Sequence, residues 1–227
     1  LYNKSDKLID LSTLLVNSGT FSEQVLISPG EYLLVGDNSD AVFFFTINNK
    51  ALIEGFPGLT NTGALITLKN ADNLVIDEVN YADSWYGDAT KDEGGWALEL
   101  INPLDPCSTS DNWTASNEPT GGTPATQNSV YDITPDITAP QIIQVFSGPL
   151  TLVTILFDEP ISADVLSSIT WNVNGEELVP LSSSFTDDSR TGIYLEYGAA
   201  VPGAVYNFTL TGVEDCWGNA GIALAGQ

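Results

Sequence analysis

Short runs of apolar residues, separated by turn-forming residues, recur along the whole chain. The runs at residues 25–27, 32–35 and 41–47 are each bounded by Gly, Pro, Asn, Asp or Ser, which break strands and favour turns. No stretch of a dozen residues keeps the 3.6-residue apolar period of an amphipathic helix. The pattern therefore predicts an all-β protein.

Two hairpins stand out within this pattern. Residues 63–69 and 74–81 are both rich in strand formers, and the polar residues 70–73 join them. In the second half, Asn174-Gly175 separates the runs 169–171 and 177–179, and Asn-Gly is the strongest short signal of a two-residue hairpin turn. Residues 96–100 alternate apolar and polar positions, which predicts a further strand with Trp96 in the core.

A proline-containing segment divides the chain. Pro135 and Pro140 fix their backbone angles and lack an N–H, so residues 132–140 are predicted to form an extended linker. The strands on either side are numerous enough for one small sandwich each. We therefore expect two Ig-like β-sandwich domains in tandem, at residues 1–131 and 141–227.

Charge narrows the classes of function. The 227 residues include 6 Lys and Arg against 30 Asp and Glu, which gives a net charge of −24, and there is no His. Such a negative field repels phosphate backbones, so nucleic-acid binding is excluded, and mechanisms built on an imidazole base are excluded too. No apolar run approaches the roughly 18 residues of a membrane span, so membrane insertion is not expected.

The first residues indicate a segment of a longer precursor. The chain begins Leu1-Tyr2-Asn3, without Met and without the basic and apolar regions of a signal peptide. A signal peptide lying outside this segment is compatible with export.

The first half resembles the bacterial lamin tail domain over residues 1–131. The family begins its first strand a few residues before Leu-Tyr-Asn, so that strand is expected to be truncated here. The matching elements are Leu1-Tyr2-Asn3, Asp10-Leu11-Ser12, residues 27–32, Leu59, Asn61-Thr62-Gly63, residues 65–68, Asp77, Val79, Tyr81, residues 96–100, Asn112-Trp113, residues 121–124 and Asn128.

The second half, from residue 136 to 227, is similar to Ig-like domains of bacterial S-layer and adhesin-type surface proteins. The segment 136–140 resembles their entry motif, residues 157–161 (Phe-Asp-Glu-Pro-Ile) resemble a strand end of the form F-x-E-P-V, and residues 213–219 resemble a closing D-x-x-G-N. Within this motif, Asp158 and Glu159 are expected to hydrogen-bond to the linker rather than to act in catalysis.

Together the two resemblances imply a secreted or cell-surface bacterial multidomain protein in which this segment is a non-enzymatic spacer, adhesion or ligand-binding unit. The expected location is extracellular or at the cell surface. The expected partners are a cell-surface protein or glycan and further domains of the same precursor. The alternative is an accessory, carbohydrate-binding region of a larger secreted hydrolase or nuclease whose catalytic domain lies outside this segment.

Cys107 and Cys216 fall in different predicted domains. An extracellular location permits a disulfide between them, which would close a segment of roughly 110 residues. Two separate, partly buried thiols remain the alternative. Neither cysteine has an imidazole partner to activate it, so no catalytic set is recognisable and no enzyme activity is expected.

Acidic residues gather in two places where a cation could bind. Asp83, Asp88, Asp92 and Glu93 lie in one glycine-containing loop, and calcium prefers carboxylate and carbonyl oxygens in loops. The EF-hand order is missing, and a solvated acidic loop is the alternative. The second place is the domain junction, where Asp136 could meet Glu214 or Asp215. Calcium is the one cofactor that the sequence suggests.

Three aromatic residues beside turns are candidates for a ligand platform. Trp85, Tyr86 and Trp113 follow or precede turn formers, and exposed rings stack on the apolar faces of sugars. Core packing is the alternative for each of them.

Overall fold

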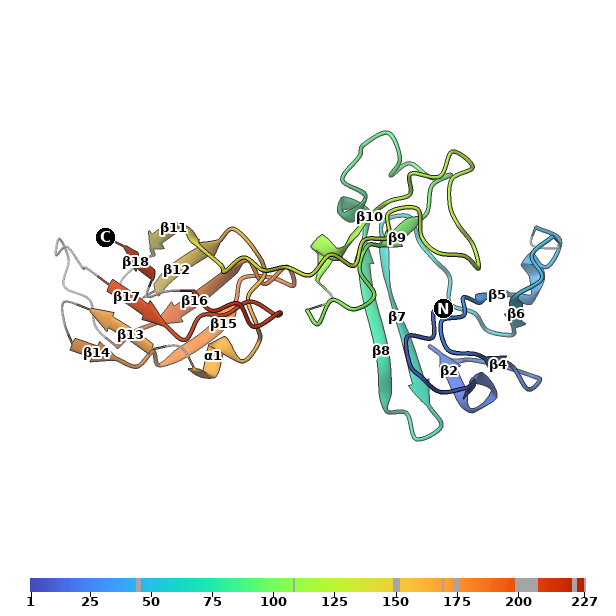
Figure 1. Cartoon of the computed structure of the whole chain (residues 1–227), viewed down its shortest axis with the longest axis horizontal. Coiled ribbons are helices and arrows are strands. Elements are labelled where there is room, and N and C mark those ends of the chain that lie inside the picture. Colours follow the sequence, from blue (N-terminus) through green and yellow to red (C-terminus); the bar gives the residue numbers. More distant parts are fainter. Residues whose placement is uncertain are drawn as a thin grey trace. The chain divides into compact units, whose positions relative to one another are not determined.

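The computed structural model describes residues 1–43, 46–107, 109–148, 152–168, 170–173, 176–198, 208–221 and 224–226 (Figure 1). In these residues nearly every regular element is a strand, and the one α-helix is the four-residue α1 (Val165–Ser168). The all-β prediction is confirmed. The chain forms two compact units, which we call unit 1 (Leu1–Leu104 with Trp113–Ile133) and unit 2 (Asp105–Asn112 with Thr134–Gln227).

Unit 1 is built on an antiparallel sheet with the strand order β3-β2-β7-β8, accompanied by three strand pairs. The sheet consists of β3 (Gly19–Thr20), β2 (Leu14–Val16), β7 (Gly63–Asn70) and β8 (Val75–Ala82). The pairs are β1 (Ile9–Asp10) with β4 (Leu26–Ile27), β5 (Leu34–Asp37) with β6 (Lys50–Ile53), and β9 (Leu98–Leu100) with β10 (Trp113–Ala115). The β5–β6 pair is parallel and the other two are antiparallel. Short 3-10 turns are formed by Leu11–Thr13, Asn38–Asp40 and Asp83–Tyr86.

The hairpin predicted at residues 63–81 is present as β7 and β8. Its turn is closed by Asn70, whose side-chain Oδ1 accepts hydrogen bonds from the backbone N–H groups of Asp72 (3.0 Å) and Leu74 (2.9 Å). Asn and Asp favour turns because their short side chains bond to nearby backbone in this way. One face of the sheet contributes to a core that also contains Leu11, Val16, Phe21, Ile27, Leu33, Ala51 and Ile53.

The strand predicted at residues 41–47 is wrong at residues 41–43, 46 and 47, and residues 44 and 45 lie outside the described residues. Residues 41–43 form a turn, and Val42 and Phe43 are 67% and 76% exposed. The reason lies just upstream, where the carboxylate of Asp37 accepts hydrogen bonds from the backbone N–H (2.8 Å) and hydroxyl (2.6 Å) of Ser39. This cap starts the 3-10 turn Asn38–Asp40 and diverts the chain from an extended path.

Unit 2 contains two four-stranded antiparallel sheets in its described residues. The first has the order β11 (Ile142–Ser147), β12 (Leu152–Phe157), β16 (Gly192–Glu196), β15 (Ser182–Phe185), and the second has β14 (Glu176–Leu178), β13 (Thr170–Val173), β17 (Phe208–Thr211), β18 (Leu224–Gly226). Both sheets contribute to the core, which comprises Ile155, Phe157, Ile161, Val165, Ile193, Leu195, Leu210 and Val213. Asn174 and Gly175 lie outside the described residues, but the strands beside them pair antiparallel with Val173 opposite Glu176.

The boundary between Ile133 and Thr134 falls inside the predicted linker. The division of the chain also has a feature that the sequence did not predict. The segment Asp105–Asn112, which connects β9 to β10 and ends in a 3-10 turn (Ser110–Asn112), belongs to unit 2 although both strands belong to unit 1. The chain therefore passes between the units three times.

A buried carboxylate organises the end of unit 1. Glu99 on β9 is only 3% exposed, and it accepts hydrogen bonds from the Thr123 hydroxyl and from the backbone N–H and hydroxyl of Ser129, all at 2.7 Å. Burial raises the pKa of Glu99, but these bonds and one from Ser116 outweigh it, so the pKa lies below its ordinary value. The sequence predicted a strand at residues 96–100 but gave no role to Glu99, which fastens the loop 116–131 to β9.

Replacing Glu99 by Gln should lower the free energy of unfolding of unit 1 by about 2 kcal/mol at neutral pH, because an amide nitrogen would face N–H and O–H donors. The pKa of Glu99 in the folded chain lies below the ordinary value of 4.5. The stabilisation by the ionised carboxylate is therefore fully present above about pH 4.5 and is lost as the pH falls through the folded-state pKa. Urea unfolding followed by tryptophan fluorescence at about pH 7 and about pH 3 measures both effects. Glu93→Gln, at an exposed position, is the control. An equal destabilisation at both pH values would contradict this role.

Candidate metal centre

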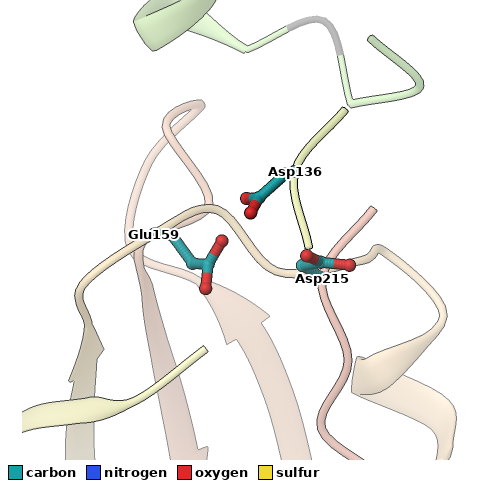
Figure 2. A group of neighbouring side chains, drawn as sticks. All are labelled: Asp136, Glu159 and Asp215. Atoms are coloured by element: carbon teal, nitrogen blue, oxygen red, sulfur yellow. The ribbon is translucent and has the colours of Figure 1, made fainter. Parts of the chain in front are cut away.

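Three carboxylates of unit 2 lie close together. One carboxylate oxygen from each of Asp136, Glu159 and Asp215 lies within 4.8 Å of the other two. Figure 2 shows the carboxyl groups of Asp136 and Glu159 facing each other with Asp215 beside them. The three residues come from the segment before β11, the segment after β12 and the segment after β17. We call this group the carboxylate triad.

Asp215 is the buried member of the triad, with 2% of its surface exposed. Its Oδ1 accepts hydrogen bonds from the backbone N–H groups of Trp217 (2.8 Å) and Asn219 (2.7 Å), and its Oδ2 accepts one from Asn219 Nδ2 (2.7 Å). A carboxylate removed from water needs such partners, and here they fold residues 215–219 into a tight turn. An isolated bridge pairs Asp215 with Ile161, close to Glu159 in sequence.

Asn219 extends this arrangement to the linker. Its Nδ2 also donates to the backbone oxygen of Asp136 (3.0 Å), so one side-chain amide contacts two members of the triad. The Asp136 carboxylate in turn accepts hydrogen bonds from the backbone N–H (2.9 Å) and hydroxyl (2.6 Å) of Thr138. The linker residues 136–138 are therefore held in a defined conformation on unit 2.

Glu159 completes the triad from the Asp-Glu-Pro sequence after β12. Its neighbour Asp158 accepts a hydrogen bond from the N–H of Gln141 (2.7 Å), and Glu159 itself is hydrogen-bonded to Asp136. Both acids thus contact the linker or the residue that follows it, as the sequence predicts. Burial, the bond to Asp136 and the nearby charges raise the pKa of Glu159 to about 8. The hydrogen bonds from Thr138 hold the pKa of Asp136 below its ordinary value.

The triad has no basic residue to balance it. Arg190 is the only Lys or Arg in unit 2, and its guanidinium carbon lies 5.9 Å over the ring of Phe185, with Nη1 3.9 Å from Cys107 Sγ. Three carboxylates at this spacing therefore keep a proton on Glu159 or take up a cation. Carboxylate and carbonyl oxygens are the ligands of hard divalent cations such as Ca²⁺.

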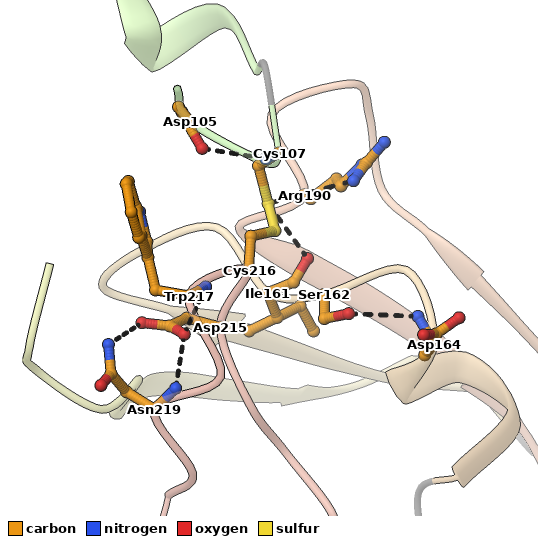
Figure 3. The surroundings of a disulfide bond; sticks show 10 residues. All are labelled: Asp105, Cys107, Ile161, Ser162, Asp164, Arg190, Asp215, Cys216, Trp217 and Asn219. Atoms are coloured by element: carbon orange, nitrogen blue, oxygen red, sulfur yellow. Dashed lines mark hydrogen bonds between the residues drawn. A yellow bond between two sulfur atoms is a disulfide. The ribbon is translucent and has the colours of Figure 1, made fainter. Parts of the chain in front are cut away.

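A disulfide joins Cys107 to Cys216, next to the triad residue Asp215 in sequence (Figure 3). The two Cα atoms are 5.4 Å apart across a sequence separation of 109 residues. The Sγ of Cys107 lies 4.0 Å from the backbone oxygen of Ile161, and the Cys107 N–H donates to Asp105 Oδ1 (2.9 Å). Because the segment 105–112 belongs to unit 2, the bridge lies within that unit and attaches this segment to it.

The acidic loop of unit 1 is arranged differently. Asp83 begins the 3-10 turn Asp83–Tyr86 and is exposed, as is Glu93, while Asp88 and Asp92 are half-buried. The carboxylate of Asp88 accepts hydrogen bonds from the hydroxyl (2.7 Å) and backbone N–H (2.9 Å) of Thr90, and these bonds lower the pKa of Asp88. In the part of the chain that the structure describes, the triad is the one group of three such ligands. The cation site in this loop stays a prediction from the sequence.

The three aromatic candidates lie in unit 1. The rings of Trp85 and Trp113 are 6.3 Å apart and inclined by 37°, and both residues are half-buried. Tyr86 is also half-buried, and its hydroxyl donates to the backbone oxygen of Trp96 (3.0 Å). The structure thus brings Trp85 and Trp113 together and gives Tyr86 a structural bond.

Sequence reasoning placed Asp136 with Glu214 or Asp215 as a possible cation site; the structure selects Asp215 and adds Glu159, which the sequence missed. The position of Glu159 in the Asp-Glu-Pro sequence could have indicated this role, but the sequence analysis expected Glu159 only to hydrogen-bond to the linker. In the bend that follows β12, Asp158 bonds to Gln141 while Glu159 reaches the triad.

Comparison with protein-family models gives no match for this chain, and comparison with curated proteins gives none. Among solved structures, the N-terminal part of the bacterial S-layer protein SbsC is similar to 39% of this chain at 18% sequence identity, with a TM-score of 0.34. The match spans 22% of that chain. A TM-score of this size does not define a shared fold. Among the described residues, no helix has the length and apolar character to cross a membrane.

Replacing Asp215 by Asn should destabilise unit 2 by about 2 kcal/mol, because one oxygen becomes an N–H₂ group that faces Asn219 Nδ2. Urea unfolding measured by circular dichroism tests this. Glu214→Gln is the matched control, because Glu214 is the exposed neighbour of Asp215. If both variants unfold at the same urea concentration, Asp215 does not hold the turn 215–219.

Proposed function

We propose that this chain is a non-enzymatic segment of a secreted or cell-surface bacterial multidomain protein, in which it acts as a spacer, adhesion or ligand-binding unit. The proposal includes an Ig-like character for both units, lamin-tail-like in unit 1 and S-layer- or adhesin-like in unit 2. One observation carries it, the disulfide between Cys107 and Cys216.

Disulfides form and persist in oxidising compartments and are rare in the cytosol of most organisms. Both cysteines of this chain are used in the bridge, and Cys107 is buried with 7% exposure. The bridge fastens a connecting segment rather than presenting a reactive thiol. That arrangement suits a structural element of an exported protein.

The acidic composition supports the same conclusion. A net charge of −24 shared by both halves favours solubility and attracts divalent cations, and it opposes binding to nucleic acids and anionic surfaces. The chain has no His, and its one disulfide leaves no thiol as a nucleophile. A passive structural or binding role requires none of these groups.

We infer a second property for unit 2, the binding of Ca²⁺ by the carboxylate triad. The specific observation is that three carboxylates from three segments converge within 4.8 Å in a unit with one basic residue. A cation there would replace the proton on Glu159 and would tie the linker residue Asp136 to the segments after β12 and β17. Calcium would then stiffen the start of unit 2 as part of a surface-exposed spacer.

The alternative function, an accessory carbohydrate-binding region of a secreted hydrolase or nuclease, has a different observation in its favour. Trp85 and Trp113 form an inclined ring pair in unit 1, and both residues are half-buried. Loss of polysaccharide binding in a folded Trp85→Ala variant would favour this alternative over the spacer.

The disulfide makes the proposed location testable. When the chain is exported to a bacterial periplasm, we expect no cysteine to react with a thiol reagent before reduction. Reduction, or the double change Cys107→Ser and Cys216→Ser, should lower the free energy of unfolding of unit 2 by up to about 4–5 kcal/mol, the loop-entropy value for a closure of this length. Two reactive thiols in the exported protein, with unchanged stability, would remove the support for export.

Calcium binding predicts a thermal shift that depends on Glu159. We suggest melts at about pH 8.5, where Glu159 is mostly ionised in the absence of a cation. Calcium at about 100 times its Kd should raise the Tm of unit 2 by about 10 °C relative to EDTA. Glu159→Gln should be more stable than the natural chain in EDTA, because it removes one of three repelling charges, and it should gain less from calcium.

The control for this experiment is Asp188→Asn, which removes an exposed charge from unit 2 away from the triad. It should keep the full calcium shift. No shift in the natural chain, or an equal shift in Glu159→Gln, would contradict calcium binding at the triad. Either result would leave the disulfide-based proposal standing, because the two rest on different observations.

A further inference from the structure

One edge of the main sheet of unit 1 is open. The order β3-β2-β7-β8 places β8 at an edge, and no described strand pairs with its outer side. β8 has eight residues, as many as its partner β7, and Figure 1 shows the two strands as one long hairpin. An edge strand of this length presents unpaired N–H and C=O groups to which another strand can bind.

The hydrogen-bond pattern shows which backbone groups face outward. The N–H of Asp83 donates to the backbone oxygen of Thr62 (3.4 Å), which makes this a hydrogen-bonded pair of the ladder. In an antiparallel ladder such pairs alternate with non-bonded ones. With the observed register, Tyr81 and Val79 bond to β7, while the N–H and C=O groups of Asn80 and Glu78 point to the open side.

The exposed side chains along β8 are mostly apolar and acidic, and one basic residue, Lys69 on β7, lies opposite Val75. The consecutive residues Leu74, Val75 and Ile76 are each exposed by 51–65%, which is unusual for adjacent large aliphatic residues. Leu65 on β7, opposite Asn80, is 49% exposed. Asp72, Asp77 and Glu78 are exposed beside them. In β8 itself, Asp77 and Glu78 are consecutive, so each face of the sheet carries one acid at the edge.

The charges decide which partner fits. A second copy of this chain would bring the same acids and a further net charge of −24 to this edge, and like charges opposite each other on adjacent strands are destabilising. An extended segment with Lys or Arg would pair with Asp77 on one face and Glu78 on the other, while its aliphatic residues cover Val75 and Ile76. We propose that the outer edge of β8 binds an extended cationic segment of a partner protein by adding a strand to the sheet.

The test uses a designed peptide with the full chain. The probe is a ten-residue peptide in which pairs of consecutive Lys residues alternate with Val-Thr pairs, so that Lys lies on both faces of the added strand. Its affinity is measured by fluorescence anisotropy at about 0.15 M salt. One control peptide has Glu at every Lys position. A second has the same charges but Pro at alternate positions, so that it cannot form a strand.

Asn80 offers a matched pair of variants. Asn80→Pro removes an N–H that the fold of β8 does not use, since proline is tolerated on the open side of an edge strand. Asn80→Thr changes the same side chain but keeps the N–H. We expect Asn80→Thr to bind the Lys peptide like the natural chain, and Asn80→Pro to bind it at least about tenfold more weakly.

Glu78→Lys keeps the proposal testable if Asn80→Pro does not fold. It should weaken binding of the Lys peptide by about threefold or more and strengthen binding of the Glu peptide. Equal binding by Asn80→Pro and Asn80→Thr, or tight binding of the Pro-containing peptide, would overturn strand addition. Self-association of the natural chain that Asn80→Pro abolishes would show that the edge pairs with a second copy and would overturn the cationic partner.

Discussion

Asp215 is a carboxylate with almost no exposure to water in a unit that has one basic residue. Its charge is held by donors from the local backbone and from the side chain of Asn219, and the position of residues 215–219 follows from that requirement. Asn219 then binds the backbone of Asp136, and Cys216, adjacent to Asp215, binds the segment 105–112. The linker and the connecting segment are both attached to unit 2 at this one turn.

Unit 1 also contains a buried carboxylate that is held by neutral hydrogen-bond donors. Glu99 is buried among hydroxyl and backbone donors from residues 116–129 rather than beside a lysine or arginine. In a chain with 6 basic and 30 acidic residues, the buried acids Glu99 and Asp215 are both stabilised by neutral hydrogen-bond donors. Glu159 in the triad has no such donors among the described residues, and burial together with the neighbouring carboxylates raises its pKa to about 8.

The parts of the fold that depend on local sequence were predictable. The hairpin at residues 63–81 follows from turn formers at residues 70–73, and the pairing of β13 with β14 follows from the Asn-Gly between them. The strand predicted at residues 41–47 does not begin at residue 41, because the side chain of Asp37 caps a 3-10 turn at Asn38–Asp40 and this turn diverts the backbone despite the strand formers that follow. β-propensity is weak wherever a local hydrogen bond offers the backbone another conformation.

Features that depend on distant partners were harder to predict. The burial of Glu99 depends on the loop that folds back over β9, which the pattern of residues 96–100 does not contain. The inclusion of residues 105–112 in unit 2 depends on a bridge across 109 residues, whose existence the sequence left open. The meeting of Asp136 with Asp215 was foreseen at the boundary of the domains, but the contribution of Glu159 required the position of the segment after β12.

Titration of the Glu159 carboxyl group by carbon-13 NMR, in EDTA and in calcium, tests the triad most directly. We expect a midpoint near pH 8 in EDTA, because burial, the hydrogen bond to Asp136 and the nearby carboxylates all favour the protonated form, and a much lower midpoint once calcium is bound. A midpoint near the ordinary value of 4.5 under both conditions would show that the three carboxylates do not act on one another, and it would contradict the triad as a cation site.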